Sequence, residues 1–284
     1  MSPVLGAHVS AAGGVSKAFG RAQSIDCDTF QIFTRNQNRW ASKPLDEAEI
    51  EKWQTAADET SIAPVISHAS YLINLGSPDD ALWEKSIDAL VDELQRAEAL
   101  GLLGVVLHPG AHMEQGEEVG IARVAAGLDR AHAATDGFKT LTLLEITAGQ
   151  GTTLGYKFEH LAAMRAQAAS PERLAVCFDT CHAFAAGYDF REPSGYAAMM
   201  DEFDRTIGLD LLVCFHFNDS KGGLGSRKDR HDHIGQGAIG VSGFAHILND
   251  PRFASVPMIL ETPKSDDMHE DVENFAVLRG LIED

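Results

Sequence analysis

Short apolar segments rich in β-branched residues recur along the chain, and each ends in polar or glycine-rich residues before a helical pattern begins. The first of these segments reads VLGAHV and the last reads VPMILE. The pattern predicts eight strands, over residues 4–9, 28–33, 63–68, 103–108, 140–145, 174–179, 211–216 and 256–261.

Between these segments, apolar residues recur at helical spacing. In the clearest helix, Ser77 is expected to be the N-cap and Pro78 the first helical residue, and Gly101 is placed to end the helix. Its buried stripe is expected to be Trp83, Ile87, Leu90, Val91, Leu94 and Ala97. Further helices are expected over residues 45–59, 117–134, 158–167, 196–208, 242–250 and 270–283.

Eight strands that alternate with helices at a spacing of roughly 35 residues predict an α/β fold, a single (β/α)₈ TIM barrel over residues 1–284. A doubly wound open sheet is the alternative, because alternation alone does not show that the sheet closes. No apolar run reaches the ~18 residues of a membrane span, and the first residues lack the order of a signal peptide. We therefore expect a cytoplasmic protein that does not contact membranes. A barrel of this size needs no partner to fold, so a monomer is expected.

The formal net charge of −19 argues against a broad, nonspecific grip on nucleic acid, because binding to phosphates needs a basic surface. Two short segments are nevertheless basic. Residues 34–43 carry Arg35, Arg39 and Lys43, and residues 221–231 carry Lys221, Arg227, Lys228 and Arg230 against the single acid Asp229. They are either local contacts to phosphates or ordinary solvated loops.

Six of the eight predicted strands end on a side chain that can bind a metal ion: His68, His108, Glu145, Asp179, His216 and Glu261. In a closed barrel the carboxyl ends of the strands meet at one mouth, where barrel enzymes build their sites. Such a cluster of imidazoles and carboxylates would be poorly satisfied without cations. The sequence therefore predicts a metal centre, with zinc favoured over manganese or iron.

Three further side chains are candidates for the same mouth. His182 follows Asp179 by three residues and is expected in the loop after the strand. Cys181 is a weaker alternative, because the cysteines lack the CxxC spacing of thiolate sites and are expected to be buried and reduced. Asp229 and His231 form a DxH clip in an extended loop. Nine ligands are too many for one tetrahedral ion, so two or three ions are expected, as in phosphoester hydrolysis.

Long motifs give a more specific indication. GAHVSAAGG, SYLINLG, HPGAH, TAGQG with LGYKFEHLA, DTCHAFAAGYD, HFNDSKGGLGSRKDRHDHIGQGAIG and LETP occur in this order over nearly the whole chain. In this respect the chain closely resembles the endonuclease IV family of apurinic/apyrimidinic endonucleases. The resemblance implies a hydrolase of base excision repair that cuts DNA 5′ to an abasic site, leaves a 3′-hydroxyl and a 5′-deoxyribose phosphate, and also clears blocked 3′ ends.

The resemblance also implies how the ligands divide among three Zn²⁺ ions, with Mn²⁺ as an alternative at one of them. The first zinc would be held by His68, His108 and Glu145, the second by Glu145, Asp179, His216 and Glu261, and the third by His182, Asp229 and His231. Glu145 and Glu261 would act catalytically together with a metal-bound hydroxide.

Damaged double-stranded DNA would be the partner, met at the nucleoid, and loop side chains would enter its minor groove. The residues expected to contact DNA are Arg35, Asn36, Gln37, Asn38, Arg39, Tyr71, Leu72, Lys221, Arg227 and Arg230. Simple packing is the alternative role for Tyr71 and Leu72. Three positions depart from the family pattern: Asn38 replaces an inserted arginine, Ile146 an asparagine, and Ala69 a partner for the histidine before it.

Two other functions fit parts of the pattern. Related barrels that isomerise or epimerise sugars also use histidine, aspartate and glutamate around divalent metals, but they have no use for basic loops or for the DRHDH segment. A protein that binds DNA lesions without catalysis is the second alternative.

Overall fold

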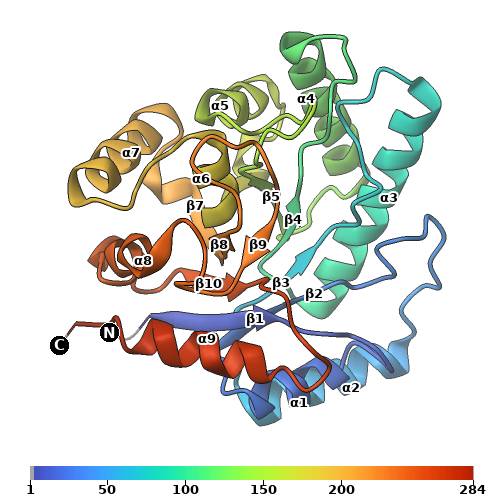
Figure 1. Ribbon diagram of the computed structural model, residues 1–284. Coiled ribbons are helices and arrows are strands. Elements are labelled where there is room, and N and C mark those ends of the chain that lie inside the picture. The colour runs from blue at the N-terminus through green and yellow to red at the C-terminus, as the bar shows by residue number, and fades with distance from the viewer. Residues whose placement is uncertain (1–2, 284) are drawn as a thin grey trace.

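In a computed structural model that describes residues 3–283, eight parallel strands close into a barrel (Figure 1). The order around the barrel is β1 (Val4–His8), β10 (Pro257–Leu260), β7 (Leu212–Phe217), β6 (Leu174–Asp179), β5 (Leu141–Glu145), β4 (Gly104–Leu107), β3 (Val65–His68) and β2 (Thr29–Ile32). Because β1 pairs with both β2 and β10, the first and last of these strands close the ring. The predicted TIM barrel is confirmed, and the open doubly wound sheet is wrong.

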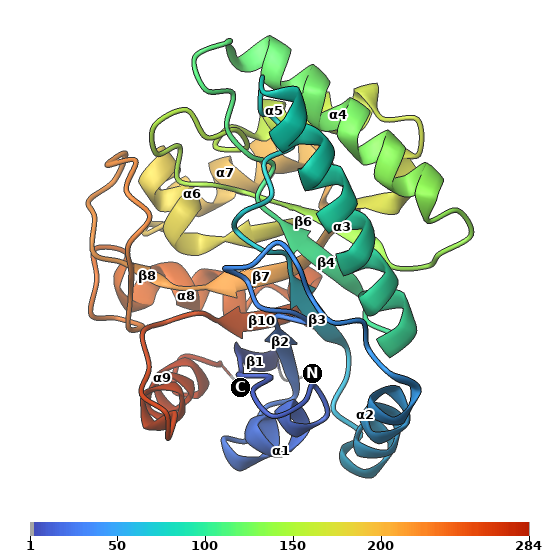
Figure 2. The same ribbon diagram turned by 90° about the vertical axis from the view of Figure 1, so that its right-hand side faces the viewer.

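Helices surround the barrel on its outside (Figures 1 and 2). They are α1 (Lys17–Ser24), α2 (Glu47–Thr60), α3 (Asp80–Leu100), α4 (Glu117–Ala134), α5 (Phe158–Gln167), α6 (Thr180–Ala186), α7 (Pro193–Thr206), α8 (Gly240–Leu248) and α9 (His269–Arg279). Within residues 3–283, none of them combines the length and the apolar character that crossing a membrane requires.

Helix α3 begins two residues later than its sequence suggests. Its N-cap is Asp79, whose Oδ1 accepts hydrogen bonds from the backbone N–H groups of Ala81 and Leu82 at 2.8 and 3.1 Å. The expected cap, Ser77, is wrong, since its hydroxyl accepts instead from the N–H of Asp79 and shapes the preceding turn. Gly101 ends the helix as predicted, in a left-handed conformation with φ of 67° that favours glycine.

Helices α1 and α6 have no counterpart in the expected elements. Helix α6 starts directly where β6 ends, and Asp179 Oδ1 caps it by accepting from the N–H of His182 at 2.7 Å. Gly187, with φ of 119°, ends this short helix. His182 therefore lies on a helix and not in the expected loop, which fixes its direction more tightly.

Two hydrophobic cores hold the barrel. A small inner core fills the barrel itself with Ile66, Val106, Leu143, Ala175, Cys177, Cys214 and Ile259, and a larger core lies mainly between the strands and the helices. All four cysteines are buried and unbridged, and burial raises the pKa of Cys181 to about 12. The expected reduced, buried thiols are confirmed.

Candidate metal centre

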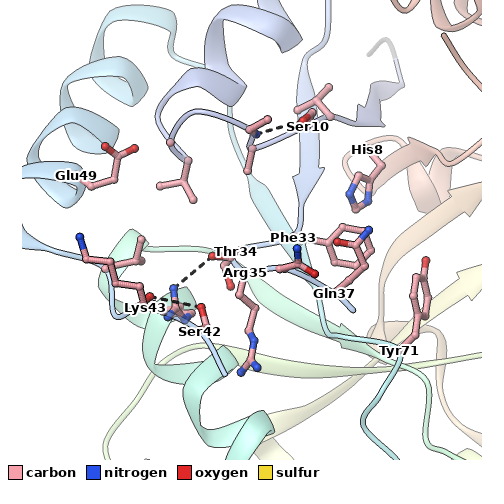
Figure 3. A pocket seen from close by; sticks show the side chains of 18 of the residues that line it. His8, Ser10, Phe33, Thr34, Arg35, Gln37, Ser42, Lys43, Glu49 and Tyr71 are labelled. Atoms are coloured by element: carbon pink, nitrogen blue, oxygen red, sulfur yellow. Dashed lines mark hydrogen bonds between the residues drawn. The ribbon is translucent and has the colours of Figure 1, made fainter. Parts of the chain in front are cut away.

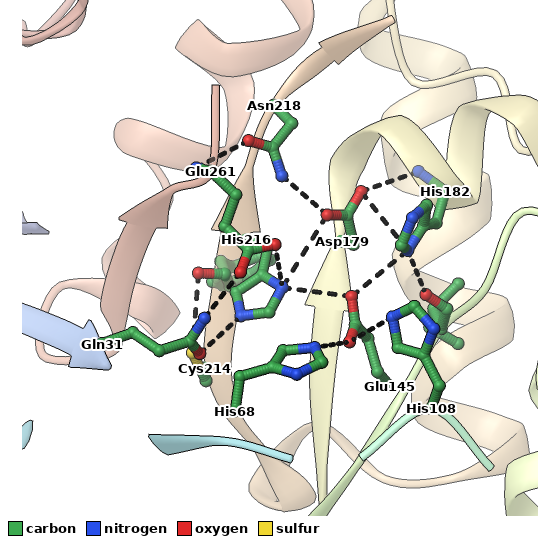
Figure 4. Close-up of polar contacts among 12 residues, drawn as sticks. Gln31, His68, His108, Glu145, Asp179, His182, Cys214, His216, Asn218 and Glu261 are labelled. Atoms are coloured by element: carbon green, nitrogen blue, oxygen red, sulfur yellow. Dashed lines mark hydrogen bonds and ion pairs between the residues drawn. The ribbon is translucent and has the colours of Figure 1, made fainter. Parts of the chain in front are cut away.

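The nine side chains expected to bind metal ions lie at the mouth of the barrel, and most of them are drawn in Figure 4. Strands β3, β5, β6 and β7 supply His68, Glu145, Asp179 and His216; His108 and Glu261 directly follow β4 and β10; His182 comes from α6, Asp229 from the loop after β8 (Asp219–Ser220), and His231 from β9 (His231–Asp232). Strands β8 and β9 pair antiparallel and carry the long glycine-rich loop back to the mouth.

The donor atoms of these side chains form, among others, three groups in each of which the atoms lie within 4.8 Å of one another. The first group is His68, His108 and Glu145; the second is Glu145, Asp179, His216 and Glu261; the third is His182, Asp229 and His231. The structure therefore brings together the three sets of side chains that the resemblance to the endonuclease IV family divides among three ions.

Glu145 joins the first and second groups. Its Oε2 lies 3.2 Å from His68 Nε2 and 3.0 Å from His108 Nε2, whereas its Oε1 lies 3.1 Å from His216 Nδ1 (Figure 4). Burial would raise the pKa of the fully buried Glu145, but the charges of His108 and His216 hold the pKa well below its usual range. The carboxylate stays ionised and offers one oxygen to each group.

Main-chain carbonyls orient two of the histidines. His68 Nδ1 donates to the carbonyl of Ala69 at 2.7 Å, and His182 Nδ1 donates to that of Ile146 at 2.9 Å. Each Nε2 then faces the mouth and is the nitrogen left for an ion. His68 thus has a backbone partner that does not depend on the side chain at position 69.

The third group contains two buried nitrogens without a hydrogen bond, His182 Nε2 and His231 Nε2. Both face Asp229 Oδ1, at 3.2 and 3.4 Å. His231 Nδ1 donates to the carbonyl of Glu261 at 3.2 Å, so its Nε2 also presents a lone pair. Two imidazole lone pairs and a carboxylate oxygen around one point form a donor set that fits a divalent cation such as zinc.

The electrostatics of the mouth also favour cations. Burial lowers the pKa of His216, but Glu261 and Glu145 together raise it to about 10. The pKa of His182 likewise lies well above its ordinary value despite burial, because of Asp179 and Asp229. The charges of the clustered carboxylates are balanced here by protonated imidazoles. Bound metal ions would balance the same charges.

Arg35 does not belong to the exposed surface. Its side chain is buried, its Nη1 donates to Asp92 Oδ2 at 2.7 Å, and its Nη2 donates to the carbonyls of Arg39 and Trp40. The guanidinium braces the loop after β2 against helix α3. These partners hold Nη1 and Nη2 inside the fold, and a contact of Arg35 with DNA stays a prediction.

The other side chains expected to contact DNA lie at the surface or close to it. Asn36, Asn38, Arg39, Tyr71, Lys221, Arg227 and Arg230 are exposed, and Gln37 and Leu72 are half-buried. Tyr71 is 57% exposed, and its ring centroid lies 5.1 Å from that of His68, so it stands over the mouth. The guanidinium of Arg227 lies 4.5 Å from the centroid of the Tyr156 ring, which holds this long side chain in place.

A cavity of about 870 Å³ opens beside the metal centre. It lies between the loop after β1 and the loop that joins β2 to α2 (Figure 3). Tyr71, His231 and Glu261 line its inner end, and the cations Lys43 and Lys264 also line it. Its volume falls in the range of sites that bind small ligands.

Sequence reasoning missed two side chains that hold the ligands. The amide of Asn218 donates from Nδ2 to Asp179 Oδ2 at 2.7 Å, and its Oδ1 accepts from the N–H of Glu261 at 2.8 Å. Gln31 is fully buried on β2 and reaches both His216 and Glu261. The sequence did contain a signal for these two residues, because Gln31 lies inside an apolar strand segment and Asn218 directly follows one.

Comparison with known proteins places this geometry in a family. A family model described as a xylose isomerase-like TIM barrel matches residues 19–280. A probable endonuclease 4 of Chloroflexus aurantiacus (strain ATCC 29366 / DSM 635 / J-10-fl) is 53% identical over 281 residues, which cover 99% of each chain. The crystal structure of endonuclease IV from Thermus thermophilus has a TM-score of 0.87 at 40% identity and covers 98% of each chain.

More distant structures share only the architecture. A D-tagatose 3-epimerase-like protein has a TM-score of 0.74 at 17% identity, over 97% of this chain and 96% of that chain. This likeness shows the barrel fold and carries no argument about chemistry. The identity to endonucleases 4 is much higher and extends over nearly the full length of the chain. The chain therefore belongs to the endonuclease IV family.

Proposed function

We propose that this protein is a zinc-dependent DNA repair endonuclease that hydrolyses the phosphodiester 5′ to abasic sites in duplex DNA. The products would be a 3′-hydroxyl and a 5′-deoxyribose phosphate, and blocked 3′ ends would be further substrates. The observation that carries the proposal is the set of three donor groups, two of which share Glu145, in a chain 53% identical to a probable endonuclease 4.

The three groups would hold three zinc ions, with manganese as an alternative at one of them. Clustered zinc supplies activated water and neutralises charge on a phosphate and its leaving group. Around the ions, the chain's own residues hold fixed positions: Glu145 stays ionised between two groups, and Asn218 orients Asp179 while fixing the backbone of Glu261. Such preorganisation lowers the cost of reaching the transition state.

The surface around the mouth would meet a bent, damaged duplex. Exposed cations of the glycine-rich loop, Lys221, Arg227 and Arg230, would contact phosphates, and Asn36 to Arg39 would reach the minor groove. Tyr71, which stands over His68, would fill the gap left by the missing base. The cavity next to Glu261 has room for a sugar–phosphate turned out of the helix.

Cleavage of a defined duplex tests the proposal. The zinc-loaded protein is incubated with an end-labelled duplex that carries one tetrahydrofuran abasic analogue, and the products are resolved on a sequencing gel. We expect a single cut 5′ to the lesion, with a 3′-hydroxyl that a polymerase extends, and no cut in the undamaged duplex. An intact lesion strand with fully metallated protein would refute the endonuclease.

The same preparation separates the two alternatives. Turnover of a free ketose, measured by chromatography, would favour an epimerase. Tight binding to the lesion duplex without any cut would favour a lesion-binding protein. A second duplex with a 3′-phosphate at a nick tests the clearing of blocked ends.

A further inference from the structure

Gln31 occupies an unusual place, at the centre of the barrel mouth but on a strand that contributes none of the nine proposed ligands. It is fully buried on β2, and its side chain reaches across to His216 on β7 and to Glu261 after β10 (Figure 4). It also reaches His8 at the end of β1. Its Oε1 lies 2.9 Å from His216 Nε2, and its Nε2 lies 2.6 Å from Glu261 Oε1 and 3.0 Å from His8 Nδ1.

The chemistry of an amide decides the direction of each of these hydrogen bonds. The amide oxygen only accepts, so His216 must carry its proton on Nε2. The amide nitrogen only donates, so it satisfies Glu261 Oε1 and the lone pair of His8 Nδ1. A flipped amide would set its oxygen against the Glu261 carboxylate, and this excludes the reverse orientation.

These bonds determine which atoms remain for an ion. With Nε2 donating to the Gln31 amide oxygen, Nδ1 is the nitrogen of His216 left for an ion, and it faces Glu145 Oε1 at 3.1 Å and Glu261 Oε2 at 3.2 Å. With Oε1 occupied by the amide, Glu261 turns Oε2 toward the same point. One side chain therefore selects the donor atom of two ligands of the second group.

We propose that Gln31 is a positioning residue that sets the tautomer of His216 and the oxygen that Glu261 offers to the second ion. This inference rests on the metal centre of the proposed function. Partners behind metal ligands orient them and tune their affinity, and their loss typically weakens metal binding about 10- to 100-fold. His8 completes the arrangement by taking the second amide proton.

Three variants test this role. Gln31→Met keeps the length of the side chain but removes its hydrogen bonds, and Gln31→Glu keeps an acceptor for His216 but sets a negative charge against Glu261. Thr29→Val is the control, because Thr29 lies two residues earlier on the same side of β2 and bonds only to the carbonyl of Pro64. Zinc affinity is measured by competition with a chromophoric chelator, and folding by circular dichroism.

We expect one of the three zinc ions to bind about 10- to 100-fold more weakly in Gln31→Met, and more weakly still in Gln31→Glu. Thr29→Val should bind all three ions as the parent does. Unchanged affinity for every ion in Gln31→Met would overturn the inference.

A second measurement needs no variant. Long-range ¹⁵N–¹H NMR of the zinc-loaded parent, with labelled histidine, reports the tautomer of His216, and we expect a proton on Nε2. A proton on Nδ1 would overturn the inference even if the variants fail to fold. Loss of one zinc in Gln31→Met together with an inactive parent would refute the endonuclease and leave the role of Gln31 intact.

Discussion

In the candidate centre, hydrogen bonds on one ring nitrogen of a histidine decide which of its two nitrogens is left for a metal ion. His68, His182 and His231 each spend Nδ1 on a backbone carbonyl, which leaves Nε2 for an ion, whereas His216 spends Nε2 on Gln31 and offers Nδ1. The sequence indicates the ligands, because a strand end points a known residue type at a known mouth. It could not indicate the carbonyl partners, since any residue type supplies a carbonyl.

Glu261→Gln tests the second group at this scale. The amide keeps the size of the side chain but loses the charge and one of the oxygens that an ion would use. We expect a folded protein whose abasic-site cleavage falls by more than the roughly 100-fold that losing an outer partner causes. Gel assays and circular dichroism measure the two properties.

The matched control for this change is Glu273→Gln, which alters the same kind of side chain at an exposed position of α9. It should cleave as the parent does. Parent-like rates in Glu261→Gln would refute the assignment of Glu261 to the second ion.

His132 gives a pH dependence that is separate from the metal centre. It is buried on α4, with Nε2 3.0 Å from the hydroxyl of Thr142, and burial together with the charge of Arg173 lowers its pKa from 6.5 to about 4. Between these values the unfolded chain binds more protons than the folded protein, so the stability present above pH 6.5 is lost as the pH falls to about 4.

His132→Gln should remove this part of the acid sensitivity, at most about 3 kcal/mol of the free energy of unfolding. Urea titrations of metal-free protein between pH 7 and pH 4 measure it, because acid release of metal then plays no part. His246→Gln, on α8, is the control. Equal slopes for the parent and His132→Gln would contradict the prediction.

Among the elements, helix α3 does more than cover the barrel. Its buried Glu93 accepts from the hydroxyl of Thr34 at 2.9 Å and from the N–H of Ser70 at 3.2 Å. Arg96, one turn on, donates to the carbonyls of Thr34 and Lys43. One face of this helix thus fixes both loops that are proposed to touch DNA on that side of the mouth.

Glu93→Leu should loosen these two loops without touching a ligand. Apolar substitution leaves the Thr34 hydroxyl and the Ser70 N–H unpaired, and we expect a loss of about 3 kcal/mol in unfolding free energy. The KM for abasic duplex should rise while the zinc content stays at the parent level. Asp88→Leu, at an exposed position of the same helix, is the control. Loss of zinc in Glu93→Leu, or an unchanged KM, would contradict this role.

The elements also show where prediction from sequence stops. Alternating strands and helices predicted the barrel, because eight buried segments with helical spacers have few other packings. Helix α6 was missed, since its seven residues show no amphipathic period and its cap, Asp179, reads as the end of a strand. The bond that holds Arg35 in place was not foreseen, because its partner Asp92 lies 57 residues away and no local pattern reveals such a pair.

At the scale of the whole molecule, the negative net charge of the protein should repel the proposed DNA substrate. The chain carries a net charge of −19, yet DNA is a polyanion. Within the two basic segments, six cations are exposed: Arg39, Lys43, Lys221, Arg227, Lys228 and Arg230. The conflict is resolved if the phosphates meet only this local patch while the rest of the surface repels the duplex.

Salt dependence measures how local the contact is. Each phosphate neutralised contributes about 0.9 to the slope of log affinity against log salt, so six cations limit the slope to about −5. Removing one contact with Arg227→Ala should reduce the slope by about 1, on damaged and undamaged duplexes alike. Fluorescence anisotropy in the Glu261→Gln background measures this without cutting the DNA.

The control for Arg227→Ala is Arg205→Ala, in the last turn of α7 and so at the end of the barrel away from the mouth. Removing that cation makes the molecule equally more acidic, so an effect of net charge alone would change both slopes by the same amount. We expect only Arg227→Ala to change the slope, because counterions are released where phosphates are neutralised. Equal changes in both variants would mean that the patch does not contact DNA and that the overall charge governs binding.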